Sequence, residues 1–280
     1  MGKVTKWLQR IRMISKQLNE DNVRAFAAQS AYFLMLSAIP LLILVTAIFQ
    51  IFLKNTNIRI QIADWPIQLL PAGISDFFEK IMNDVYQKTA TVLSVSLLTA
   101  VWAAGKGMTA ITQGLNSIYD VEESRNYIIQ RLYGMLYVIL FLISILISIV
   151  LVVFGNKLGE YLTLFFPFLE PLLGSLLKNR VFLISVILLL VFMALYKFMP
   201  NCRKRWRNQV PGAIFSTIGW LFFSFGFSIY VDYFSVFSNM YGSMTTIILL
   251  MLWLYWCMYI VLLGGKINYY MEMGFPWQNC

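Results

Sequence analysis

Long apolar runs, separated by shorter polar segments, follow one another along the whole chain. A run of about 20 apolar residues is long enough for a helix to cross the hydrocarbon layer of a membrane, which is about 30 Å thick. A helix pairs its own backbone groups and therefore needs no water to do so. The pattern predicts an all-α integral membrane bundle of six transmembrane helices, with spans near residues 31–53, 91–112, 132–154, 181–199, 211–231 and 244–263.

The segments outside these spans carry helical patterns of their own. Residues 1–28 alternate basic and apolar side chains at a spacing near 3.6, which predicts an amphipathic N-terminal helix on the cytoplasmic membrane surface. A solvated tail is the alternative. Residues 54–88 predict an extracytoplasmic amphipathic helix, and residues 155–178 an interfacial segment. The remaining predicted units are a transmembrane domain over 29–270 and a cytoplasmic C-terminal tail over 271–280.

Composition and charge agree with a membrane location. The chain is 59% hydrophobic and 12% charged, whereas soluble domains are roughly 45–50% apolar and about 25% charged. Of the 22 Lys and Arg, 14 fall in segments expected inside and 7 in the outer loops, with Lys106 in a span. Because positive charge favours the cytoplasmic side, we expect both termini to be cytoplasmic.

The residue types present exclude several kinds of chemistry. The chain has no histidine, which excludes His-ligated zinc and Ser-His-Asp catalysis. Its three cysteines, Cys202, Cys257 and Cys280, form no extracellular pair in this topology, so no disulfide is expected. The sequence has no phosphate-binding loop, EF-hand or dinucleotide fingerprint. We therefore expect no catalytic residue, no metal site and no cofactor.

The span at 91–112 is poor in strongly apolar residues and contains Lys106. A lysine at the centre of a membrane helix costs about 2.5–3.5 kcal/mol, which roughly cancels the favourable contribution of those residues. We expect this helix to pack inside the bundle, where Gly107 permits close contact. Two interpretations of Lys106 stay open. Its ammonium group faces a polar cavity and is functional, or it lies near the cytoplasmic end and extends to the lipid head groups.

Prolines and glycines mark expected kinks and packing faces. Pro40 lies inside the first span and should kink it. Pro211 is expected in the first turn of the fifth span, where proline is tolerated. Gly219 and Gly226 form a stripe of small residues that should contact another helix. Gly242 belongs to the short outer turn before the sixth span.

Polar residues gather in the turn after the second span. This turn contains Asn116, Tyr119, Glu122, Glu123 and Arg125. These side chains could bind a cation or a polar head group. Alternatively, the acidic residues could cap the next helix while Arg125 pairs across the turn.

The loop after the fourth span is the densest basic run of the chain. It contains Arg203, Lys204, Arg205 and Arg207. Its place between two spans favours contact with anionic lipids over contact with RNA. Lys266, near the end of the sixth span, adds positive charge on the same side.

Blocks along almost the whole length resemble the YihY / virulence factor BrkB family, formerly labelled ribonuclease BN-like. The blocks are AAQSAYFLMLSAIPLLILV, GMTAITQGLNSIYDVEESRNY, YKFMPNCRKRWRNQVPGAIFSTIGWLFFSFGFSIYV, YGSMTTIILLMLWLYW and LLGGKINYY. The resemblance implies a six-helix bacterial inner-membrane protein, and lipid or amphiphile transport has been suggested for relatives. It also implies that the ribonuclease label is a misassignment. Two positions depart from the family pattern: Lys106, where relatives usually carry a small or neutral residue, and Lys266, where they commonly carry Glu.

Lys106, the charged turn and the basic loop together predict an interior path with a positive cytoplasmic mouth. The leading hypothesis is a transporter or flippase-like protein for an anionic lipid or amphiphile, with membrane lipids and no nucleic acid as partners. The alternative is a non-transporting scaffold or regulator that docks a cytoplasmic partner, and a nuclease is a distant third. A cavity that reaches Lys106 favours transport, whereas a bundle filled with side chains favours the scaffold.

Overall fold

The structure, a computed structural model, describes residues 3–52, 90–165, 180–202, 204–241 and 243–274. Within these ranges the regular secondary structure is entirely helical. The helices are α1 (Lys3–Glu20), α2 (Val23–Phe52), α5 (Ala90–Ile118), α6 (Tyr127–Phe165), α8 (Arg180–Phe198), α9 (Trp206–Tyr241) and α10 (Ser243–Met273). The helix predicted within 54–88 lies outside the described residues.

Four of these helices are long and apolar enough to cross a membrane. The segments are Tyr127–Ser148 in α6, Val181–Phe198 in α8, Trp206–Val231 in α9 and Ile247–Met273 in α10. They correspond to the predicted third, fourth, fifth and sixth spans. The predicted first and second spans fall in α2 and α5, which are helical over 30 and 29 residues but are not among these four.

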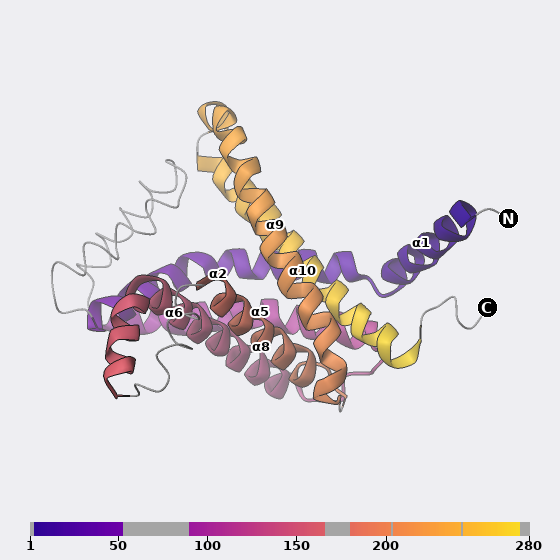
Figure 1. Ribbon diagram of the computed structural model, residues 1–280, viewed down its shortest axis with the longest axis horizontal. Coiled ribbons are helices and arrows are strands. Elements are labelled where there is room, and N and C mark those ends of the chain that lie inside the picture. Colours follow the sequence, from indigo (N-terminus) through magenta and orange to yellow (C-terminus); the bar gives the residue numbers. More distant parts are fainter. Residues whose placement is uncertain (1–2, 53–89, 166–179, 203, 242, 275–280) are drawn as a thin grey trace.

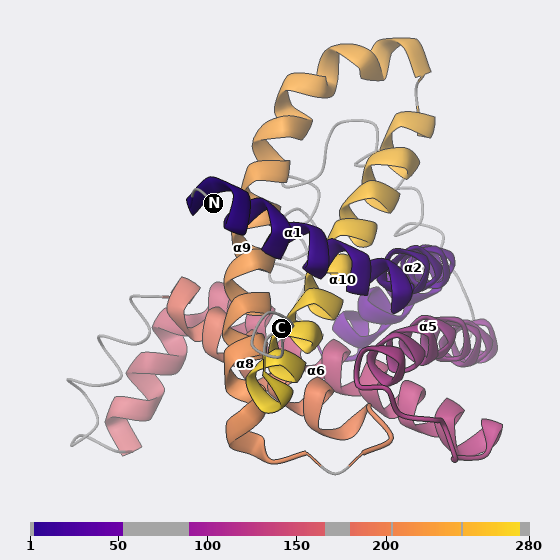
Figure 2. The ribbon, with the colours of Figure 1, turned by 90° about the vertical axis from the view of Figure 1, so that its right-hand side faces the viewer.

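The helices are arranged as an aligned group crossed by a hairpin. α2 and α5 pack along each other, and with α6 and α8 they form the aligned group (Figure 1). α9 and α10 form a hairpin that crosses this group and extends beyond it (Figure 2). The core lies where the hairpin meets the group, and its fully buried side chains include Leu115, Tyr196, Ala213, Cys257 and Leu262.

The N-terminal segment forms two helices rather than the one predicted over 1–28. α1 ends at Glu20 and α2 begins at Val23. Asn22 has a φ of 53°, a left-handed conformation that Asn tolerates better than most residues. The chain therefore changes direction here, and α1 lies across the α9–α10 hairpin (Figure 2).

Several helices are longer than the predicted spans. α6 continues to Phe165 instead of ending near 154, α9 continues to Tyr241 through the predicted outer turn, and α10 runs to Met273 into the predicted tail. The apolar run predicts only the part of a helix that fits the hydrocarbon layer. The helix itself continues until a residue that disfavours helix ends it. Gly274, with a φ of 89°, provides such a stop after α10.

α9 and α10 cross closely at two glycines, Gly212 and Gly264. A Cβ atom on Gly212 would overlap the carbonyl oxygen of Gly264, so only glycine fits at this point. The space beside Gly264 is filled by the hydroxyl groups of Tyr196 and Ser216, whose oxygens lie 2.6 Å apart. The Tyr196 hydroxyl also donates to the carbonyl oxygen of Val261 at 2.6 Å. Close packing and a buried hydroxyl pair thus fix the hairpin to α8.

α5 packs in the same way against α2 and α6. A Cβ on Gly107 would lie 3.0 Å from Cγ of Leu34 and 3.2 Å from the carbonyl oxygen of Ser30, both in α2. On the other side, a Cβ on Gly134 of α6 would lie 2.8 Å from the carbonyl oxygen of Gly105. Small residues therefore let this weakly apolar helix lie between its neighbours.

The other predicted packing and kink residues give a mixed result. A Cβ on Gly219 would lie 2.9 Å from a side-chain methyl group of α10, so this residue faces a helix. Gly226 does not, because a Cβ there would meet nothing within 4 Å. Pro211 lies in the second turn of α9 rather than the first, since the helix begins at Trp206. α2 is helical on both sides of Pro40, and Gly242 lies outside the described residues.

The glycine crossing can be tested by a pair of single substitutions. Gly264→Ala should destabilise the protein by about 1–3 kcal/mol, because the added methyl group must separate α9 from α10. Gly226→Ala, in the same hairpin, should be neutral or gain up to about 1 kcal/mol from helix propensity. Thermal unfolding of the purified proteins in one detergent measures both. Equal melting temperatures for the two variants would contradict the close approach of α9 and α10 at Gly264.

Candidate functional site

Polar side chains gather at one end of the bundle, where α5 ends, α6 begins and α8 turns into α9. We call this region the polar end and define it as residues 116–125, 197–202, 204–209 and 266–272 together with Asp21. Three groups of contacts make up the polar end, and each joins segments that are far apart in the sequence.

The first group joins the α5–α6 turn to the α8–α9 turn. Arg125 donates from Nε and Nη2 to the two carboxylate oxygens of Glu123, at 2.7 and 2.8 Å, and from Nη2 to the carbonyl oxygen of Met199 at 2.8 Å. Asn116 donates to Glu123 at 2.7 Å and accepts from the backbone N–H of Asn201 at 2.8 Å. We call this set of five residues the turn clamp.

The electrostatics of the turn clamp favour the ion pair. Burial alone would raise the pKa of Glu123, but the hydrogen bonds and charge of Arg125, with the amide of Asn116, outweigh it and lower this pKa. The hydrogen bond to Glu123 in turn raises the pKa of Arg125. Glu122 is exposed, and its backbone carbonyl accepts from Asn201 at 2.9 Å. These contacts support the interpretation in which the charged residues pair across the turn and hold it in place.

The second group surrounds the carboxylate of Glu272 in α10. Lys204 forms an ion pair with it, while Asn208 and Gln209 donate to it at 3.1 and 3.4 Å. Gln209 also accepts from the Tyr119 hydroxyl at 3.3 Å. Burial raises the pKa of Tyr119 well above its ordinary value, so the phenol stays neutral and can donate.

Asn268 extends this second group into the α9–α10 crossing. Its amide nitrogen donates to Gln209 at 3.2 Å, and its oxygen accepts from the backbone N–H of Gly212 at 2.6 Å. Pro211 disturbs the backbone bonding of α9 at this point because it lacks an N–H and its ring crowds the preceding turn. A side chain of α10 therefore supplies a hydrogen-bond partner for the backbone of α9 next to this proline.

The third group is an ion pair between the N-terminal turn and α10. Lys266, which is 4% exposed, donates to the carboxylate of Asp21 at 2.5 Å and lies 4.6 Å from the ring centroid of Tyr269. Ser117 donates to the backbone carbonyl of Asp21 at 3.0 Å. Burial raises the pKa of Asp21, and Lys266 lowers it only in part. The charge of Lys266 is thus matched within the fold and does not add to an open positive mouth.

Lys106 lies on an exposed face of α5, away from these three groups. Its ammonium nitrogen lies 5.4 Å from the ring centroid of Phe33 in α2. Leu98 and Trp102, which precede it on the same face at intervals of four residues, are 70% and 51% exposed. Arg131 of α6 is buried beside them, donates to the carbonyl oxygen of Trp102 and lies 4.5 Å from its ring centroid. Lys106 is therefore a cation at the end of an exposed apolar stripe.

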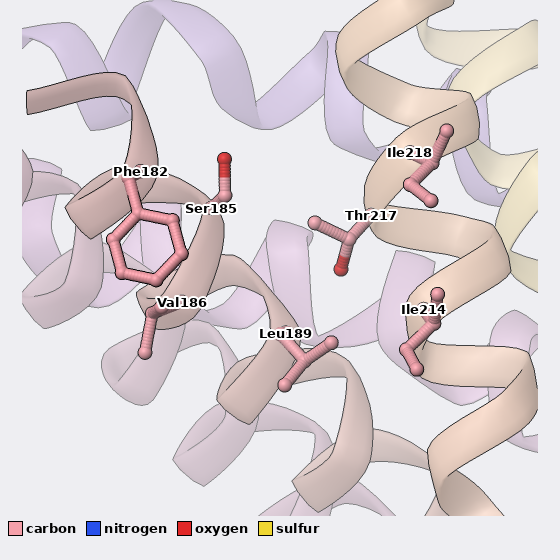
Figure 3. A pocket seen from close by; sticks show the side chains of 7 residues that line it. All are labelled: Phe182, Ser185, Val186, Leu189, Ile214, Thr217 and Ile218. Carbon is pink, nitrogen blue, oxygen red and sulfur yellow. The ribbon is translucent and has the colours of Figure 1, made fainter. Parts of the chain in front are cut away.

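Two cavities in the described part of the chain lie away from Lys106. The larger, about 310 Å³, lies between α8 and α9 (Figure 3). Its two hydroxyl groups, on Ser185 and Thr217, donate to carbonyl oxygens of their own helices at 2.7 and 2.8 Å. The smaller, about 160 Å³, lies under α1 and includes Lys266. The predicted polar cavity at Lys106 is not one of these two.

The basic residues between α8 and α9 differ in whether they have a partner within the fold. Lys204 is half-buried and paired with Glu272, whereas Arg205 and Arg207 are exposed. Arg203 lies outside the described residues. The polar end therefore offers two exposed arginines of this run to the surroundings, and its remaining described lysine serves the fold.

Sequence reasoning missed the residues that complete the polar end. They are Asp21, Asn201, Gln209, Asn268 and Glu272. One signal was available, because Asp21 and Glu272 are carboxylates in segments assigned to the basic cytoplasmic side. A carboxylate on the side of the membrane that is rich in lysine and arginine is a candidate counter-ion. The amide partners gave no such signal, since nothing in their spacing shows which helices meet.

The ion pair of Asp21 and Lys266 can be tested by a double-mutant cycle. Asp21→Asn should cost about 3–5 kcal/mol, because it leaves a buried ammonium group unpaired, whereas Asp21→Asn combined with Lys266→Met should recover most of that loss. The matched control is the exposed pair of Lys16 and Glu20, whose side chains are 78% and 60% exposed. Lys16→Ala should change stability by about 0.5 kcal/mol or less. Additive effects of the two substitutions in the cycle would disprove the coupling.

The turn clamp predicts a specific dependence of stability on pH. Glu123 has a lowered pKa in the folded protein, so its stabilising contribution is present above its unfolded value, about 4.3 for a glutamate. That contribution is lost as the pH falls through the lower, folded value. Chemical unfolding between pH 3 and pH 7 should show a smaller loss of stability on acidification for Glu123→Gln than for the wild type. If the free energy of unfolding fell equally with pH in the wild type and in Glu123→Gln, the ion pair of the turn clamp would not stabilise the fold.

Comparison with known proteins finds one family that covers almost the whole chain. The family model described as Virulence factor BrkB matches residues 14–275. The ribonuclease-like protein YfkH of Bacillus subtilis is 35% identical over 243 residues, which cover 86% of this chain and 87% of YfkH. A UPF0761 membrane protein of Alteromonas mediterranea is 27% identical over 255 residues, 90% of this chain and 83% of that protein. No solved structure gives a significant match.

The matched region runs from the second half of α1 to the end of α10, so it includes all three groups of the polar end and Lys106. The family resemblance seen in the sequence is confirmed. This apolar, helical chain belongs to the virulence factor BrkB family, whose relatives include bacterial UPF0761 membrane proteins.

Proposed function

We propose that the protein crosses the membrane six times, with both termini cytoplasmic, and acts on an anionic lipid or amphiphile as a transporter or flippase-like protein. At 1.5 Å per residue, α2 and α5 are each about 45 Å long, which exceeds the roughly 30 Å of the hydrocarbon layer. α5 packs against α2, α6 and α10, so its weak hydrophobicity does not prevent it from crossing. The polar end is the cytoplasmic end in this topology.

The exposed ammonium group of Lys106 is the observation that carries the proposal. Gly105, its neighbour, crosses α6 at Gly134, seven residues after the start of the membrane segment at Tyr127. Seven helical residues correspond to about 10 Å. The polar head-group layer is roughly 5–7 Å thick on each side, and the stem of a lysine near the end of a span can carry its ammonium group to that layer. This depth supports the proposal that Lys106 binds the phosphate of a lipid in the cytoplasmic leaflet.

The surroundings of Lys106 fit a lipid better than a small soluble anion. Leu98 and Trp102 form the exposed apolar stripe that leads away from it, and Phe33 lies beside its ammonium group. An amphiphile can place its charged group at Lys106 and its hydrocarbon part along the stripe. A free anion would gain only the charge contact.

A second function, a non-transporting scaffold or regulator, is favoured by the closed polar end. The three contact groups pair Arg125, Lys204 and Lys266 within the fold. Arg205 and Arg207 remain exposed on the same end and could dock an acidic cytoplasmic partner. Neither cavity described above provides an interior path from Lys106.

Ribonuclease activity, indicated in the name of YfkH, is not proposed for this chain. The carboxylate of Glu123 is occupied by Arg125 and Asn116 and is not free to act as a base. Hydrolysis of RNA by the purified protein, abolished by Glu122→Gln, would be needed to support that activity.

Lipid binding at Lys106 can be measured by native mass spectrometry of the purified protein with phosphatidylglycerol. Lys106→Ala should weaken retention of phosphatidylglycerol by about fivefold, the change expected for loss of about 1 kcal/mol of attraction per basic residue. Lys106→Arg should preserve retention, and Lys16→Ala serves as a control for an exposed lysine elsewhere. Unchanged retention in Lys106→Ala would refute the assignment.

Transport and scaffolding are separated by a lipid-transfer assay. Vesicles containing the protein should move fluorescent phosphatidylglycerol between leaflets faster than empty vesicles, and Lys106→Ala should slow this movement. If the protein binds the lipid but does not accelerate transfer, the scaffold function replaces the transporter.

A further inference from the structure

The smaller cavity is an apolar groove built from three helices. Its lining consists of Ile14 and Leu18 of α1, Phe215 of α9, and Leu263, Lys266, Ile267 and Tyr270 of α10. We call it the α1 groove. Its volume is about 160 Å³, well below the roughly 300–1,000 Å³ of pockets that enclose whole drug-sized ligands. The α1 groove therefore suits part of a chain-like molecule.

The covering helix is held in place by polar contacts on one side of the α1 groove. The Tyr270 hydroxyl donates to the side-chain oxygen of Gln17 at 2.6 Å. Just beyond the end of α1, Asp21 receives the hydrogen bond from Lys266 at 2.5 Å. These contacts tie the second half of α1 to α10. They also turn the ammonium group of Lys266 towards Asp21, so that the groove receives the apolar part of this side chain.

The lining and the charge around the α1 groove indicate the chemistry of its occupant. The described lining offers no unpaired charge, so the part inside the groove must be apolar. Arg10 stands one turn before Ile14 on the same face of α1 and is exposed. Arg12 is exposed on the opposite face. An apolar groove beside membrane segments of α9 and α10, covered by a helix that carries an arginine one turn before the groove, is complementary to a lipid with a negative head group.

We propose that the α1 groove binds an acyl chain of an anionic phospholipid of the cytoplasmic leaflet, with the head group at Arg10. This lipid is a resident ligand that fastens the amphipathic helix α1 to the bundle. The site is separate from Lys106 and does not depend on transport. It gives α1 a role that its basic, amphipathic pattern alone does not specify: α1 covers a bound lipid and does not simply rest on the membrane surface.

The test uses the full-length protein in nanodiscs of phosphatidylcholine that contain phosphatidylglycerol with a photoactivatable diazirine on its acyl chain. After irradiation, peptide mass spectrometry should find labels on Ile14, Leu18, Phe215 and Ile267. Unlabelled phosphatidylglycerol should compete for these labels, whereas added phosphatidylcholine and inorganic phosphate should not.

Matched variants separate the α1 groove from general lipid contact. Ile267→Trp fills the groove and should reduce labelling of the α1 peptide about tenfold, while Ile248→Trp, on an exposed part of the same helix, should leave it unchanged. Arg10→Gln should reduce the preference for phosphatidylglycerol about fivefold, and Arg12→Gln should have a smaller effect. Because Trp could disturb folding, the melting temperature of each variant is measured in parallel.

Two results would overturn the proposal. One is labelling of the α1 peptide that Ile267→Trp does not reduce. The other is labelling of α1 at the level of exposed sites on α6, with no competition by phosphatidylglycerol. Lys106→Ala should leave labelling of the α1 groove unchanged, so failure of this site and failure of the proposed function can be told apart.

Discussion

The structure depends on pairing the charged and polar groups that the helices bury at the polar end. The chain is 59% hydrophobic, and in a membrane the hydrophobic effect does not draw helices together, because lipid tails are as apolar as the helix surfaces. Buried polar groups can be satisfied only by one another. The polar end fulfils this requirement with three contact groups, and each of them joins helices that the sequence separates by many residues.

This pairing explains why several basic residues serve the fold and not a ligand. Lys266 is matched by Asp21, Lys204 by Glu272 and Arg125 by Glu123. Removing any one partner would leave a charge with little access to water. Close glycine contacts complete the assembly, since they bring α9 against α10 and α5 against α6 closely enough for the polar side chains to reach each other.

The sequence was informative about elements and much less so about contacts. The apolar runs predicted the four membrane segments of α6, α8, α9 and α10, and the pattern of 1–28 predicted helix in α1. The break at Asp21–Asn22 was missed, because a left-handed Asn leaves no periodic signal. Gly107 and Gly219 lie against other helices and Gly226 does not, and the sequence did not distinguish them, since a small residue is equally suited to an exposed position. The crossing of Gly212 and Gly264, and the partners Gln209, Asn268 and Glu272, depend on which helices meet, and this is decided only in three dimensions.

Lys106 differs from the other described cations of the bundle in its position on an exposed apolar stripe. The proposed function therefore gives Lys106 a lipid of the membrane as its partner. Its most direct test replaces Lys106 with photoactivatable benzoylphenylalanine in cells, followed by irradiation and mass measurement of the purified protein. The account predicts an adduct with the mass of an anionic phospholipid, and no such adduct when the buried Met108 is replaced in the same way. Adducts at position 106 only with protein, or with zwitterionic and anionic lipids in proportion to their abundance, would contradict it.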